Sequence, residues 1–121
     1  MRTPLLAGNW KMYKNPEETK QFLEEFLPLV ADVTDREILL CAPFIDLAIL
    51  LEGVIASNVQ GGAQNAHWEN EGAYTGEVSM KMLQDIKCPW VLIGHSERRQ
   101  YFSETDQTVN LKVKSALDMG R

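Results

Sequence analysis

The chain has 121 residues, 45% of them hydrophobic, and a formal net charge of −5 at pH 7. This length suits one modest domain with a hydrophobic core, so residues 1–121 are expected to form a single unit. The acidic balance, with scattered lysines and arginines, argues against nucleic acid or an anionic membrane as the partner. No apolar run approaches the ~20 residues of a membrane span, so small molecules or proteins are the expected partners.

The cysteines and the first residues both indicate a cellular compartment. Cys41 and Cys88 stand in apolar surroundings without a CxxC motif, which predicts two buried, reduced thiols. Residues 1–7 offer too short an apolar stretch for a signal peptide. The expected location is therefore the cytoplasm.

Four short apolar segments are typical of strands that are covered on both faces. Each is bounded by glycine, proline or a polar residue, and none shows clean alternation of polar and apolar side chains. The predicted strands are residues 4–9, 37–42, 58–64 and 89–94.

The first helix is predicted to begin after Asn15. Asn15 can cap it, Pro16 suits its first position, and Glu18 can bond back to the cap. Pro28 lacks a backbone N–H group and is expected to end or kink this helix near Leu27.

Cap residues also predict the later helices. Asp46 is expected to cap the second helix, and Ser79 the third. Ser103 and Asp106 have the spacing of a capping box before the last helix, and Gly120 suits its left-handed C-terminal cap.

The alternation of strands and helices predicts a parallel sheet with right-handed crossovers. Two architectures remain open, a doubly wound sheet and a (β/α) barrel. A nucleotide-binding doubly wound sheet usually has a glycine-rich turn after its first strand, whereas here Gly8 is the single glycine. A barrel gathers its chemistry at the carboxyl ends of many strands.

Polar and ionisable residues follow three of the four predicted strands. Any one of them could be an ordinary turn or surface residue, but parallel strands bring their carboxyl ends to one edge. The set therefore predicts an active-site face. Its members are Asn9 and Lys11 after the first strand, Gln64 and Asn65 after the third, and His95, Ser96 and Glu97 after the fourth.

Two of these side chains suggest a chemistry. Lys11 offers a compact positive charge suited to a phosphate or a developing oxyanion. His95 precedes a predicted helix, whose dipole disfavours protonation, so a neutral imidazole that donates a hydrogen bond is expected. No metal is expected, because His67 is the only other histidine and no carboxylate or cysteine falls at ligand spacing.

The segment 66–78 is too long for a routine connection in so short a chain. It contains His67, Trp68 and Tyr74 together with Gly72 and Gly76. A self-packed Ω-loop is one interpretation. Exposed aromatic residues favour the other, a loop that docks on a second copy of the chain.

Four motifs, in order along the whole chain, give it a close resemblance to triose-phosphate isomerases. They are AGNWKM at 7–12, GAQN at 62–65, GAYTGEVS at 72–79 and GHSERRQYF at 94–102. The resemblance implies an α/β fold, the N-terminal (β/α)4 half of a TIM (β/α)8 barrel with parallel strands. It also implies interconversion of glyceraldehyde 3-phosphate and dihydroxyacetone phosphate in glycolysis and gluconeogenesis, by a homodimer without cofactor or metal.

The same resemblance assigns roles to residues of the predicted face. His95 matches the neutral electrophile that polarises the substrate carbonyl, for which this family is the standard example. Lys11 matches the lysine that holds the substrate and stabilises enediolate charge, and Asn9 lines the same pocket. Glu97 matches a glutamate near that lysine with a role in proton shuttling.

The long loop matches the one that enters the other subunit of the family's dimer and steadies the lysine and histidine there. Arg98 is expected to help anchor it. The loop residues concerned are Asn65, Tyr74, Thr75, Gly76 and Glu77.

A whole barrel needs about 250 residues, and four strands are predicted here. The family's glutamate base, mobile lid and phosphate-gripping loops belong to the other half, and no glutamate of this sequence occupies that motif. Because isomerisation needs a base near the carbon-bound proton, these residues alone are expected to be inactive. Ala42, where the family commonly has a second proline, is a minor departure.

Two alternatives remain open. The first is a non-catalytic, truncated or engineered half barrel that self-associates, because its first and fourth strands would be open edges. The second is another phosphosugar isomerase on the same fold, which the motifs at 7–12 and 94–102 make the weaker interpretation.

Overall fold

The computed structural model describes residues 2–120. The chain divides into two compact units, Met1–Gln64 and Asn65–Arg121, and each is described by itself. None of the helices in residues 2–120 is long and apolar enough to cross a membrane.

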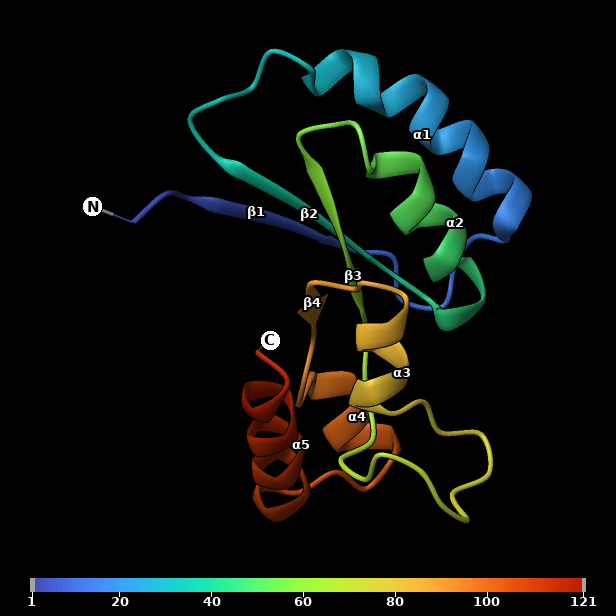
Figure 1. Cartoon of the computed structure of the whole chain (residues 1–121), viewed down its shortest axis with the longest axis vertical. Coiled ribbons are helices and arrows are strands. Elements are labelled where there is room, and N and C mark those ends of the chain that lie inside the picture. Colours follow the sequence, from blue (N-terminus) through green and yellow to red (C-terminus); the bar gives the residue numbers. More distant parts are fainter. Residues whose placement is uncertain (1, 121) are drawn as a thin grey trace. The chain divides into compact units, whose positions relative to one another are not determined.

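Strands and helices alternate in the first unit (Figure 1). The parallel strands run in the order β1, β2, β3, with Leu5 opposite Glu37 and Ile38 opposite Val59. Parallel pairing brings the carboxyl ends of all three strands to one edge of this sheet. The elements are β1 (Leu5–Asn9), α1 (Pro16–Val30), β2 (Glu37–Ala42), α2 (Phe44–Val54) and β3 (Val59–Ala63).

The core of the first unit lies between its helices and its sheet. Helix α2 packs against α1, β2 and β3, and β2 is buried from Ile38 to Ala42. Strand β1 differs, because Leu5 is 41% and Leu6 53% exposed. Apolar side chains therefore face solvent along β1 in the described chain.

The second unit contains a long loop and three helices around a short strand. Its core includes Ala66, Met80, Leu83, Cys88 and Ala116. Cys41 and Cys88 are both buried and neither is in a disulfide, as the sequence predicts. The elements are α3 (Met80–Asp85), β4 (Trp90–Val91), α4 (Ser96–Tyr101) and α5 (Asp106–Asp118).

Helix α1 begins as predicted but ends later. Asn15 accepts a hydrogen bond from the Glu18 amide at 2.8 Å, and the Glu18 carboxylate accepts one from the Asn15 amide at 3.2 Å. The helix continues through Pro28 to Val30, so it does not end near Leu27, and the kink expected there as the alternative stays a prediction. Proline lacks the donor for one backbone bond, and in the exposed last turn solvent can satisfy the carbonyl that it leaves free.

Two predicted caps are also wrong. Asp46 lies inside the first turn of α2, where Pro43 occupies the N-cap position without a side-chain bond. Helix α5 is capped by Thr105 in a capping box with Thr108, not by Ser103. Ser103 has φ +59°, a left-handed conformation, whereas a cap residue needs extended backbone.

Two other caps are confirmed. The Ser79 hydroxyl accepts a hydrogen bond from the Met82 amide at 3.0 Å and so opens α3. Gly120 follows α5 with φ +76°, which is the left-handed end predicted for the last helix.

Candidate functional site

The carboxyl end of β1 and the side chain that follows β3 meet in the first unit. The Gln64 amide nitrogen lies 3.1 Å from Asn9 Oδ1 and 2.8 Å from the Lys11 carbonyl oxygen. Asn9 Oδ1 also accepts the Lys11 backbone N–H at 2.9 Å. The polar strand ends predicted from the sequence are thus joined by hydrogen bonds in this unit.

These bonds hold Lys11 in an unusual backbone conformation. Its φ is +54°, a region that costs a non-glycine residue about 1 kcal/mol or more. Trp10 fixes the residue before it, because the Trp10 amide donates to the Cys41 carbonyl at 2.9 Å and its ring meets that of Phe22 edge-on at 5.3 Å. Lys11 is therefore presented from a fixed and strained turn with its side chain exposed.

His95 is the N-cap residue of α4 in the second unit. Its Nδ1 accepts the backbone N–H of Glu97 at 3.1 Å. A ring nitrogen that accepts a hydrogen bond carries no proton, so this bond specifies a neutral imidazole with its proton on Nε2. The neutral donor predicted from the sequence stays a prediction, which this bond supports.

Glu97 stands in the first turn of α4, and one of its carboxylate oxygens lies 3.8 Å from His95 Nδ1. The His95 side chain is 30% exposed, so solvent or a ligand can reach its ring. The structure thus brings His95 and Glu97 together, with the backbone amide of Glu97 closer to the ring than its carboxylate.

The loop between β3 and α3 closes on itself. At its neck the His67 amide donates to the Val78 carbonyl at 2.8 Å, and near its tip the Glu77 amide donates to the Tyr74 carbonyl at 3.0 Å. The His67 ring contacts the rings of Trp68 and Tyr74, whose centroids are 4.1 and 4.3 Å away. Its Nδ1 is 3.5 Å from a Glu77 oxygen.

The tip of this loop exposes four of the residues predicted to dock on a partner, namely Tyr74, Thr75, Gly76 and Glu77. Gly76 has φ +89° with no atom within 4 Å of an added Cβ. A β-carbon would have room there, so it is the left-handed backbone that favours glycine.

The root of the loop carries a buried ionic cluster. Lys112 donates to Asn65 Oδ1 at 2.8 Å and lies 3.1 Å from Glu104 Oε2. Arg98 also donates through Nε to Glu104 Oε2. Burial raises the pKa of the Glu104 carboxyl, but its bonds with Arg98 and Lys112 outweigh that effect and leave the pKa below its usual value.

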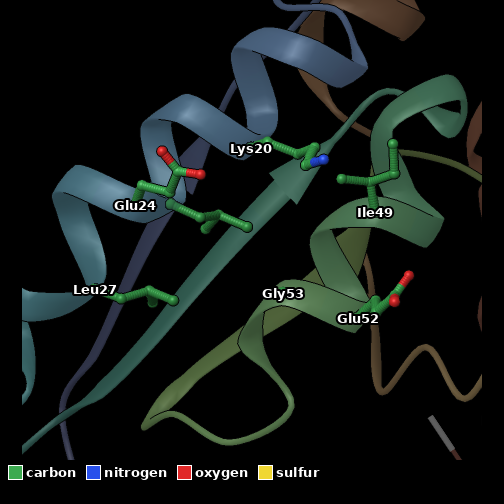
Figure 2. A pocket seen from close by; sticks show the side chains of 7 residues that line it. Lys20, Glu24, Leu27, Ile49, Glu52 and Gly53 are labelled. Atoms are coloured by element: carbon green, nitrogen blue, oxygen red, sulfur yellow. The ribbon is translucent and has the colours of Figure 1, made fainter.

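A groove between α1 and α2 is a competing candidate for the site. It has a volume of about 480 Å³, and Figure 2 shows it between the two helices. Its lining has three aliphatic and three charged side chains, and holds none of the strand-end residues. The lining residues are Lys20, Leu23, Glu24, Leu27, Ile49, Glu52 and Gly53.

A family model described as triosephosphate isomerase matches residues 4–121. The chain belongs to the triosephosphate isomerase family. A triosephosphate isomerase of Trichormus variabilis is 54% identical over 121 residues, which are 99% of this chain and 50% of that protein. One from Alkaliphilus metalliredigens is 52% identical over 118 residues, covering 98% and 47%. The chain spans about half the length of the curated relatives it matches.

A solved structure confirms the predicted fold class. The crystal structure of triosephosphate isomerase from Bartonella henselae matches with a TM-score of 0.89 and 34% identity, over 98% of this chain and 49% of the other. The fold is therefore the α/β fold of the N-terminal half of a TIM barrel, with four β/α units and parallel strands.

Sequence reasoning missed part of this triosephosphate isomerase half. The sequence predicts Gln64 as a polar residue after a strand, but not as the residue that bonds to Asn9 and Lys11, and it assigns no role to Glu104 or Lys112. Lys112 stands at helical spacing from Val109 and Ala116 of α5, which is the sequence signal that it faces the core. Its partners are 8 and 47 residues away in sequence and become visible only in the fold.

Proposed function

We propose that this chain supplies the electrophilic half of a triosephosphate isomerase site. The observation that carries the proposal is the hydrogen bond from the Glu97 amide to His95 Nδ1 at 3.1 Å. It leaves an N–H group on Nε2 of a neutral ring, suited to polarise a carbonyl without giving up its proton prematurely. The substrates are glyceraldehyde 3-phosphate and dihydroxyacetone phosphate.

Lys11 supplies the positive charge in this proposal. An ammonium group stabilises both the substrate phosphate and the negative charge that develops on an enediolate oxygen. The clamp from Gln64 to the Lys11 carbonyl at 2.8 Å supports a fixed position for it. Asn9 is the substrate-binding companion, and Glu97 has the looser role in proton transfer.

The base that removes the carbon-bound proton is proposed to come from the half that these 121 residues do not span. Alone, they are then expected to give no isomerase turnover above background. No metal or cofactor is invoked, since proton transfer between adjacent carbons needs an electrophile and a base but no electron carrier.

The assembly and setting follow the family in this proposal. A homodimer is proposed, with the loop residues Tyr74, Thr75, Gly76 and Glu77 at the contact, and with Asn65, which is buried at the root of the loop, and Arg98 at its base. Cytoplasmic glycolysis and gluconeogenesis are the proposed setting. The exposed loop tip and the exposed apolar side chains of β1 support association.

The test combines this chain with a protein made of the remaining half of the Trichormus variabilis relative. Turnover of glyceraldehyde 3-phosphate is expected from the mixture and from neither part alone. His95→Gln should lower the reconstituted kcat by about 10²-fold or more, the usual contribution of a positioned proton donor. Lys11→Met should also abolish most activity, whereas Lys81→Met, at an exposed lysine of α3, should not.

A binding measurement separates this function from a non-catalytic scaffold. The probe is 2-phosphoglycolate, a phosphorylated mimic of the enediolate, titrated into the mixture of halves by calorimetry. Binding that is lost in Lys11→Met but kept in Lys81→Met supports the isomerase site. A mixture that forms a stable complex but binds no probe would favour the scaffold.

A further inference from the structure

Lys112 is a buried cation that neither the proposed reaction nor the motifs of the sequence account for. It lies on α5 with its side chain only 4% exposed. Lysine is almost never buried to this extent unless its charge is paired. Here the ammonium group has two partners, Asn65 Oδ1 at 2.8 Å and Glu104 Oε2 at 3.1 Å.

These partners link two parts of the second unit. Asn65 begins the loop that runs to Ser79. Glu104 connects α4 with α5 and also accepts a hydrogen bond from Arg98 of α4. A chain of polar contacts thus runs from the first residue of the loop, through Lys112 and Glu104, to the helix that has His95 as its N-cap.

The loop needs an attachment of this kind at its entry. Its internal bonds, such as the one from the His67 amide to the Val78 carbonyl, hold its shape. Its exit is fixed because Ser79 caps α3. The Asn65 side chain accepts a hydrogen bond from Lys112, which ties the entry of the loop to α5. A hydrogen bond to a charged group is stronger than one between neutral groups.

We propose that Lys112 is a positioning residue, which holds the root of the loop 65–79 in register with α4 and therefore with His95. An effect of Lys112 on catalysis would rest on the proposed function, whereas its effect on the position of the loop does not. The structural part concerns the second unit alone and can be measured in the chain as it is, without any activity.

The test is amide hydrogen exchange in Lys112→Met, a change that removes the charge and keeps a long, flexible side chain. Peptides covering residues 65–79 are expected to exchange about tenfold faster or more, since a hydrogen bond to a charged group contributes at least that factor. Peptides of α1 should be unchanged. Lys114→Met, an exposed lysine on the same helix, is the matched control and should change neither region.

Asn65→Ala keeps the test decisive should Lys112→Met fail to fold, because it removes the acceptor and leaves the pair of Lys112 and Glu104 intact. It should accelerate exchange of the loop to a similar extent. Where both variants fold, the double variant should exchange little faster than either, as expected for partners in one interaction. Unchanged loop exchange in Asn65→Ala, or acceleration spread evenly over α5 and the loop, would overturn the positioning role while leaving the proposed isomerase function standing.

Discussion

Asp46 is a carboxyl group with no solvent exposure at the first turn of α2. Neither of its oxygens has a hydrogen-bond partner among residues 2–120. Burial, and then the charge of Glu18, raise the pKa of Asp46 above its usual value, while Lys14 acts in the opposite sense. The folded chain therefore disfavours the ionised form of this side chain.

The raised pKa of Asp46 predicts that the fold loses stability as the pH rises. A group whose pKa is raised on folding stabilises the fold fully below its unfolded pKa, and that contribution is lost as the pH rises through the folded pKa. Asp46→Asn removes the charge, so at pH 7.5 it is expected to increase the free energy of unfolding by about 1 kcal/mol or more. The gain should shrink toward pH 3. Urea denaturation followed by circular dichroism between pH 3 and 8 measures it.

Asp32→Asn, at an exposed aspartate after α1, is the control and should have a small effect at every pH. An Asp46→Asn variant that is less stable than the parent across the whole range would contradict the prediction. It would mean that the carboxylate is stabilised in the fold by its charge.

At the scale of elements, replacing Pro28 measures how much this proline lowers the stability of α1. Pro28→Ala restores a backbone donor in the last turn, and alanine is the better helix former. Part of this gain is offset because proline also restricts the unfolded chain. The expected net increase in unfolding free energy is about 1 kcal/mol, measured by urea or thermal denaturation.

Pro16→Ala is the matched control, because proline at the first helical position has no intrahelical bond to lose. That change should be neutral or slightly destabilising. Equal effects of the two substitutions would show that the position of Pro28 in the helix is not what matters.

Some ends of helices and strands can be predicted from the sequence and others cannot. Asn15, Pro16 and Glu18 are a local signal within one turn, and the start of α1 followed from it. The start of α5 did not, because serine and threonine caps stand two residues apart and only the left-handed backbone at Ser103 decides between them. The sequence predicts a strand over residues 89–94, whereas β4 is Trp90–Val91, because apolar character alone does not fix the ends of a strand.

The candidate site shows the same division between local and distant signals. The tautomer of His95 could be expected because its partner is two residues away, at the start of the same helix. The clamp of Gln64 on Lys11 spans 53 residues, and the contact between Lys112 and Asn65 spans 47. No single-sequence pattern pairs residues at such distances.

At the scale of the molecule, the exposed side chains of β1 predict self-association of the 121-residue chain. Leu5 and Leu6 present apolar surface on a strand, which a second chain can cover. Sedimentation velocity over a range of concentrations should show oligomers. Leu6→Lys should shift the distribution several-fold toward monomer by placing a charge on that surface.

Leu29→Lys is the control, because Leu29 is 81% exposed but stands alone on α1. It should leave the distribution unchanged. A monomer at all concentrations in the parent chain would contradict the prediction. Whether residues 1–121 behave as a single domain stays a prediction, and coincident unfolding curves from probes in the two compact units would support it.

Gln64 and Asn65 are neighbouring carboxamides that differ in length by one methylene group. The longer reaches Asn9 and the Lys11 carbonyl within the first unit, and the shorter meets Lys112 within the second. Exchanging them would preserve composition and charge but leave one side chain too short and the other too long. In a comparison of related sequences, we therefore expect the pair to occur at this point in the order Gln-Asn and not in the order Asn-Gln.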